Sequence, residues 1–128
     1  MAFVFYNPNP ENKRTGDCSV RALCKALDQD WETSFLGMVV FAMKDYDMPS
    51  ANHVWGEYLI EKGFLRFVIP SVCPYCMSVG EFAQKFPRGT YVLACDNDHV
   101  VTLVDGDWYD TWDSVDSVVL YFYQKQEE

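Results

Sequence analysis

Apolar residues recur every three or four positions in the first half of the chain, which is the spacing of one helical face. Val20, Leu23, Cys24 and Leu27 follow this spacing and predict a helix over about residues 18–27, with Asp17 as its N-cap. The same reasoning predicts two more helices, one from Trp31 to Tyr46 and one that starts at Ser50 and ends before Gly63.

The second half of the chain is rich in β-branched and aromatic residues, which favour strands. Polar turn sequences interrupt these segments and predict hairpins. The segment from Ser78 to Phe86 is an exception, because Ser78 followed by Glu81 forms a capping box that opens a short helix. The predicted strands are 65–69, 91–95, 99–104, 108–112 and 118–123, with a short edge strand at 3–6 ahead of a Pro- and Asn-rich loop at 7–16.

A run of helices followed by a run of strands predicts an α+β protein. We expect the N-terminal helices to pack on a C-terminal antiparallel sheet, in two layers around one core. The chain has 128 residues and shows no internal repeat or linker, so we expect a single domain spanning residues 1–128.

The excess of acidic over basic residues narrows the classes of molecule that the chain is expected to bind. The chain carries 19 acidic and 10 basic residues, for a net charge of −9, and the basic residues do not cluster. A nucleic acid would be repelled, so nucleic-acid binding is disfavoured.

The N-terminus lacks the features of a secretory signal, and no apolar run is long enough to cross a membrane. We therefore expect a soluble cytoplasmic protein without a membrane partner. Five cysteines cannot all pair, and reduced thiols are expected in that compartment. The oligomeric state is left open.

Cys18 has the most favourable position for chemistry among the five cysteines. It falls in the first turn of the predicted helix, directly after Gly16 and Asp17. Unpaired backbone N–H groups and the helix dipole stabilise a thiolate at this position. Cys18 is therefore the candidate nucleophile, although a buried structural cysteine would fit the same pattern.

His99 is the candidate base, because it opens a predicted strand and is one of only two histidines. A two-residue turn at Asp105-Gly106 would place His99 and Asp110 on the same face of a hairpin, so that Asp110 orients the imidazole. A three-residue turn would instead make Asp113 the orienter. The turn chemistry alone leaves both registers open.

Three segments together resemble the papain-like cysteine peptidases, most closely the bacteriocin-processing branch, and also short bacterial and phage proteins. The segments are 15–23, which contains Cys18, then 98–101, which contains His99, and 109–112. His99 follows Cys18 by 81 positions (99 − 18), and the family has its histidine about eighty residues after its cysteine. The resemblance implies a papain-like fold with a Cys18–His99 pair. For a phage-encoded protein the compartment would be the host cytoplasm.

The resemblance also implies further roles. The triplet Asp110-Thr111-Trp112 is similar to the Asn-Ser-Trp of papain-type enzymes, which favours Asp110 over Asp113 and puts Trp112 beside His99. Asn12 occupies the position six residues before the nucleophile where the family usually has the Gln of the oxyanion hole. The implied activity is hydrolysis of a peptide or isopeptide amide in a peptide or protein substrate, with no cofactor and no metal. Because Asn is shorter than Gln, a weakly active or inactive scaffold that binds a protein or a small metabolite is the alternative.

Two other motifs were weighed and set aside. Cys73 and Cys76 have the spacing of a glutaredoxin dithiol, but the predicted flanking elements do not fit that fold. They could also be half of a zinc site, but the remaining candidate ligands, Cys24, His53 and Cys95, lie at no recognised spacing. His53 lies inside a predicted helix, where a structural or surface role is expected.

Overall fold

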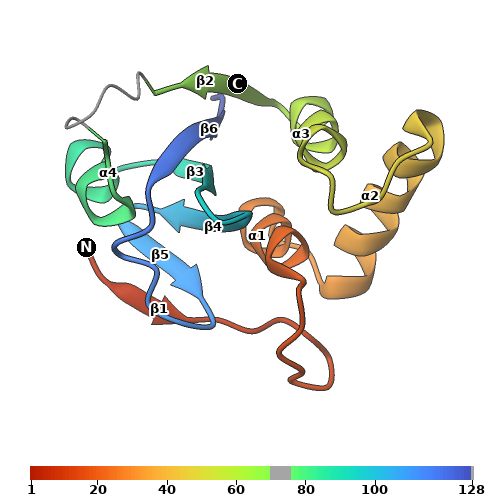
Figure 1. Cartoon of the computed structure of the whole chain (residues 1–128), viewed down its shortest axis with the longest axis horizontal. Helices are drawn as coiled ribbons and strands as arrows, with labels where there is room; N and C mark the ends of the chain where they lie inside the picture. The colour runs from red at the N-terminus through yellow and green to blue at the C-terminus, as the bar shows by residue number, and fades with distance from the viewer. Residues whose placement is uncertain (70–75, 128) are drawn as a thin grey trace.

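The computed structural model describes residues 1–69 and 76–127. Across these residues the chain is an α+β protein with four helices and one six-stranded mixed sheet (Figure 1). The elements in chain order are β1 (Phe3–Phe5), α1 (Cys18–Leu27), α2 (Trp31–Asp45), α3 (Asn52–Glu61), β2 (Phe64–Val68), α4 (Val79–Lys85), β3 (Thr90–Cys95), β4 (His99–Val104), β5 (Asp107–Asp110) and β6 (Val119–Lys125).

The strand order in the sheet is β1-β5-β4-β3-β6-β2. Strands β3 to β6 pair antiparallel, as expected, and β2 joins one edge antiparallel to β6. The edge position expected for the N-terminal strand is confirmed, but β1 runs parallel to β5, so the sheet is mixed. A parallel neighbour needs a long crossover, which here is most of the chain.

The expected two layers around one core are wrong, because helices cover both faces of the sheet. Val92 and Ala94 of β3 pack with α1, α2 and α3 in one core cluster, while Leu93 packs in a second cluster with Phe82 of α4. Figure 1 shows the central strands between α4 and the other three helices. Strands β3 and β4 are almost entirely buried along their length, as strands covered on both faces are.

Most predicted boundaries shift by one or two residues, among them those of α3 and β5. Helix α3 begins at Asn52 instead of Ser50, because the amide of Ala51 closes a turn onto the carbonyl of Met48. The strand expected over 108–112 ends at Asp110, since the amide of Thr111 donates to the Asp110 side chain and not to another strand. The capping box of Ser78 and Glu81 is confirmed at the start of α4.

The turn of the hairpin between β4 and β5 has two residues, which decides between the two turn lengths that the sequence left open. Val104 pairs with Asp107, and both turn residues, Asp105 and Gly106, have positive φ angles of 49° and 87°. These angles belong to the tight turns that match the twist of a hairpin. As a result the start of β4 and the end of β5 lie at the same edge of the hairpin.

Gly56 allows α3 to pack closely on the sheet. A methyl group at this position would overlap the phenol of Tyr123, which is buried and packs against Trp55. We expect Gly56→Ala to lower the free energy of unfolding by about 1–3 kcal/mol, the usual cost of overpacking a core. Urea unfolding followed by far-ultraviolet circular dichroism measures it. Gly16→Ala is the control, because a methyl group at Gly16 meets no atom within 4 Å; an equal loss in both variants would contradict the packing role.

Candidate active site

Cys18 is the first residue of α1 and is partly exposed. Asp17 occupies the N-cap position, but its side chain makes no capping hydrogen bond, so the predicted capping role is wrong. Its carboxylate instead accepts hydrogen bonds from the Arg21 guanidinium and, at 3.0 Å, from the indole N–H of Trp31. The N–H groups of the first turn of α1 therefore donate no hydrogen bond to the Asp17 carboxylate and can stabilise negative charge at the thiol.

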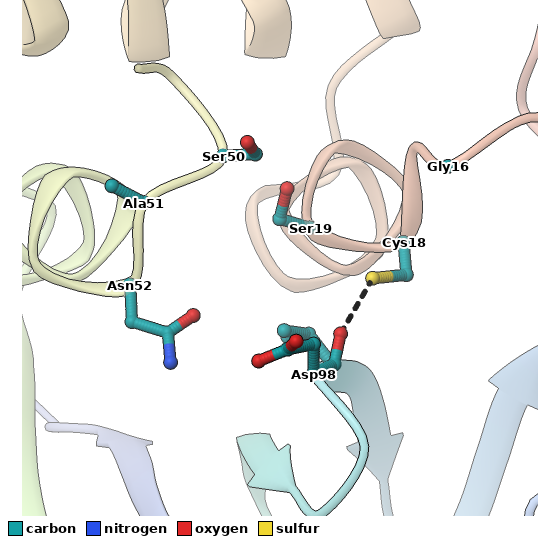
Figure 2. Close-up of a pocket in the computed structure, with 8 residues that line it drawn as sticks. Gly16, Cys18, Ser19, Ser50, Ala51, Asn52 and Asp98 are labelled. Carbon is teal, nitrogen blue, oxygen red and sulfur yellow. Dashed lines mark hydrogen bonds between the residues drawn. The ribbon is translucent and has the colours of Figure 1, made fainter. Parts of the chain in front are cut away.

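His99 and Asp110 lie together beside Cys18. The Nε2 atom of His99 donates to Oδ2 of Asp110 at 2.5 Å. The imidazole also interacts electrostatically with the Cys18 side chain. Because Nε2 is occupied by Asp110, Nδ1 is the ring nitrogen that remains for the thiol. The Sγ atom of Cys18 lies 3.7 Å from the backbone oxygen of Asp98, as Figure 2 shows. The structure thus brings the three predicted residues together, with a hydrogen bond between His99 and Asp110.

Asp110 is almost completely buried, with 1% of its surface exposed. Besides His99, it accepts hydrogen bonds from the Ser114 hydroxyl at 2.8 Å, the Thr111 amide at 2.8 Å and the Arg21 guanidinium at 3.3 Å. Burial works to raise the pKa of this carboxyl, but the hydrogen bonds from His99, Ser114 and Thr111 outweigh it and hold the pKa below its usual value. Asp110 is therefore an ionised and firmly held acceptor for the imidazole.

The interaction between Cys18 and His99 lowers the pKa of the thiol and raises the pKa of the imidazole. Burial raises the pKa of the Cys18 thiol, but the hydrogen bond to His99 and the nearby positive charges outweigh burial and lower that pKa overall. For His99, burial lowers the pKa, while the hydrogen bonds to Asp110 and Cys18 raise it to about 9. The geometry therefore favours a thiolate–imidazolium pair.

Asp113 does not reach His99. Its carboxylate accepts the indole N–H of Trp108 at 2.9 Å and the amide of Val115 at 3.2 Å. This corrects the alternative in which Asp113 orients the imidazole. The reason is the two-residue turn, since that register places Asp110 on the face of His99.

Trp112 packs against the imidazole, in the place that the resemblance implies. The two ring centroids are 4.7 Å apart, with an angle of 40° between the planes. Half of the Trp112 surface is exposed, so the indole lies between the His99–Asp110 hydrogen bond and solvent. Such a cover strengthens the hydrogen bond by keeping water away from it.

Asn12 does not take the position expected of an oxyanion donor. It is exposed in the loop before α1, in a left-handed backbone conformation with φ 57°, and its amide donates to the carbonyl of Asn9. The cavity at Cys18 is lined by other residues. The side chain of Asn9 also accepts the amides of Glu11 and Lys13, and these local bonds shape the loop.

The cavity beside Cys18 has a volume of about 470 Å³. One wall comes from the start of α1 and another from the connection between α2 and α3, as Figure 2 shows. Its lining residues are Gly16, Cys18, Ser19, Ser50, Ala51, Asn52, Asp98 and Val100. The approach of Ser50, Ala51 and Asn52 to Cys18 depends on how α3 packs, so the sequence could not give the shape of this wall.

Three residues of the types that can bind a metal lie together at the junction of α2 and α3. Within the described residues, Asp45, His53 and Glu57 place one ligand atom each within 4.8 Å of the others. His53 also contacts Asp47 at 2.6 Å, so the imidazole takes part in surface ion pairs, in line with the surface role expected for it. Exposed acidic groups often lie together without a metal, so this group alone does not define a metal site. Cys73 falls outside the described residues.

A scan against protein-family models and searches among curated proteins and solved structures gave no match to this chain. No helix in the described part of the chain has the length and hydrophobicity needed to cross a membrane. We therefore infer the function from the geometry of the site.

The raised pKa of His99 can be measured directly. The chain has only two histidines, so His53→Gln leaves a single imidazole for a titration followed by nuclear magnetic resonance. We expect His99 to lose its proton near pH 9, because Asp110 and the Cys18 thiolate stabilise the imidazolium. In Cys18→Ala, we expect a lower pKa, since one of these partners is lost.

The same shift predicts how stability depends on pH. Because the pKa of His99 is about 9 in the folded chain and 6.5 is its ordinary value, the imidazolium stabilises the fold fully below about pH 6.5. That contribution is lost as the pH rises through about 9. A titration midpoint for His99 near 6.5 would contradict the ion pair.

Proposed function

We propose that this protein is a papain-like thiol hydrolase that cleaves a peptide or isopeptide amide through an acyl-enzyme on Cys18. The observation that carries the proposal is the chain of contacts from Cys18, at the start of a helix, through His99 to the buried carboxylate of Asp110. A nucleophile, its base and a group that orients the base define this class of site. A packed structural cysteine needs neither of the other two groups.

The geometry supports a two-step reaction. The Cys18 thiolate attacks the amide carbonyl carbon, and a tetrahedral oxyanion forms. The His99 imidazolium then gives its Nδ1 proton to the amide nitrogen as the C–N bond breaks, which releases the amine and leaves a thioester on Cys18. Water attacks the thioester while His99 takes its proton, and the acid leaves as the thiol is restored. Attack by an amine in place of water would give acyl transfer with the same residues.

Other groups at the site support this reaction. Asp110 holds the imidazole so that Nδ1 faces the sulfur, and Trp112 covers that hydrogen bond. The backbone amide of Cys18, at the start of α1, is our candidate donor to the oxyanion in place of Asn12. One such donor contributes about 3–4 kcal/mol of transition-state stabilisation.

The second candidate function is a papain-like scaffold that binds a protein or a small metabolite without cleaving it. The exposed position of Asn12, which is not among the residues that line the cavity at Cys18, favours this alternative, because Asn12 then does not act as the oxyanion donor that the resemblance implies. A shared fold does not determine function. Thiol reactivity separates the two candidates.

The test is mass spectrometry after exposure of the full chain to a panel of electrophilic peptide and ubiquitin-like probes. We expect one adduct on Cys18, lost in Cys18→Ala and kept in Cys24→Ala, because burial raises the pKa of Cys24. The kind of probe that reacts also identifies the acyl group. Uniform labelling of all thiols, or no adduct on Cys18, would support the binding scaffold instead.

A further inference from the structure

The wall of the cavity beside Cys18 combines small neutral side chains with a single carboxylate. Gly16, Ser19, Ser50 and Ala51 leave the space open, and Asp98 is the acidic residue in the lining. A volume of about 470 Å³ is in the range of ligand pockets. The cavity can therefore accept a side chain of a substrate that is bound at the thiol.

The backbone conformation of Asp98 sets the directions of its carbonyl oxygen and its side chain. Its φ angle of 55° is in the left-handed region, at the turn before β4, and its carbonyl oxygen lies 3.7 Å from Sγ of Cys18. In Figure 2 the carboxylate extends to the opposite side from Sγ, toward Asn52 across the cavity. A substrate side chain that enters the cavity from Cys18 would thus meet the carboxylate.

The negative charge of Asp98 is not balanced by a cation of the protein. The residue is exposed, and none of the ion pairs within residues 1–69 and 76–127 involves it. The nearby guanidinium of Arg21 is committed to Asp17 and Asp110. The overall charge of −9 further favours a positive ligand.

We propose that the cavity is a subsite for a cationic side chain, and that Asp98 makes the enzyme prefer amide substrates with Lys or Arg beside the scissile bond. This inference rests on the proposed function and names its substrate class. The carboxylate attracts the ammonium or guanidinium, while the small lining residues make room for the methylene chain.

The test compares three electrophilic peptide probes that differ only in the residue next to the reactive group, which is Lys, norleucine or Glu. Norleucine has the length of the lysine chain without its charge. The readout is the second-order rate of adduct formation on Cys18. We expect Lys to react up to about fivefold faster than norleucine, and Glu to react more slowly than both, as one solvent-screened charge pair predicts.

The variant Asp98→Asn should bring the Lys and norleucine rates to within about twofold of each other while the norleucine rate persists. Asparagine tolerates the left-handed conformation, so the turn is kept. Asp116→Asn is the matched control, because it removes the same charge from an exposed residue outside the cavity lining, and it should keep the preference.

The outcomes separate the two proposals. Equal rates for the three probes, or an equal loss of preference in Asp98→Asn and Asp116→Asn, would overturn the subsite and leave the thiol hydrolase standing. No adduct on Cys18 with any of the three probes would overturn the proposed function, and the subsite with it.

Discussion

Replacing His99 with alanine is expected to slow the alkylation of Cys18 by iodoacetamide near pH 6 by at least about tenfold. The imidazole holds the pKa of the Cys18 thiol below its ordinary value, and without it burial would raise that pKa. The reactive thiolate would then be scarce at this pH. Peptide mass spectrometry with timed quenching measures the rate at each cysteine.

His53→Ala is the matched control, because His53 lies in surface ion pairs with Asp45 and Asp47 and should not affect Cys18. Cys95 provides an internal reference, since burial raises its pKa to about 12. It should stay unlabelled in every variant. Labelling of Cys18 at the parent rate in His99→Ala would show that the imidazole does not activate the thiol.

Replacing Arg21 with methionine is expected to lower the free energy of unfolding by about 3–5 kcal/mol. Arg21 is buried and bridges two buried carboxylates, those of Asp17 and Asp110. Removing the cation leaves the buried carboxylate of Asp17 without an ionic partner and that of Asp110 with His99 alone. Urea unfolding at neutral pH, followed by tryptophan fluorescence and circular dichroism, gives the difference.

A second variant shows whether the loss comes from unpaired charge. Replacing Asp17 and Asp110 with asparagine together with Arg21→Met should recover part of the stability, because the two buried carboxylates are then removed along with their cation. Arg66→Met is the control for loss of an exposed arginine, which contacts the Tyr121 ring, and should cost less than about 1 kcal/mol. An equal loss in Arg21→Met and Arg66→Met would contradict the role of the buried bridge.

Local patterns predicted most elements because they depend on neighbours in the chain. Three-and-four spacing identified α1, the capping box identified α4, and Asp105-Gly106 gave the tight turn that places His99 and Asp110 at one edge. Asp17 is at the predicted N-cap position, but its side chain does not make the capping hydrogen bond, because tertiary contacts occupy it. Its carboxylate is taken by Arg21 and Trp31, and Trp31 lies on the next helix.

Two features of the sheet were not predictable from residue spacing: the helix α4 on its second face and the parallel pairing of β1 with β5. A strand buried on both faces and one buried on a single face differ only in what packs on them, and α4 covers the second face here. The parallel pairing of β1 with β5 joins residues more than 100 positions apart, for example Phe3 and Trp108. No local signal specifies such a contact.

The sequence by itself determined that this is an α+β chain and that Cys18 and His99, with Asp110 or Asp113, were the candidate site residues. Helix starts, strand ends and turn types follow from short-range sterics and hydrogen bonding. Only the tertiary structure decided that Asp110 and not Asp113 meets the imidazole, that Arg21 is buried between two carboxylates, and that Asp98 faces a cavity at the thiol. Those features depend on packing between distant segments, where burial and charge act across space and not along the chain.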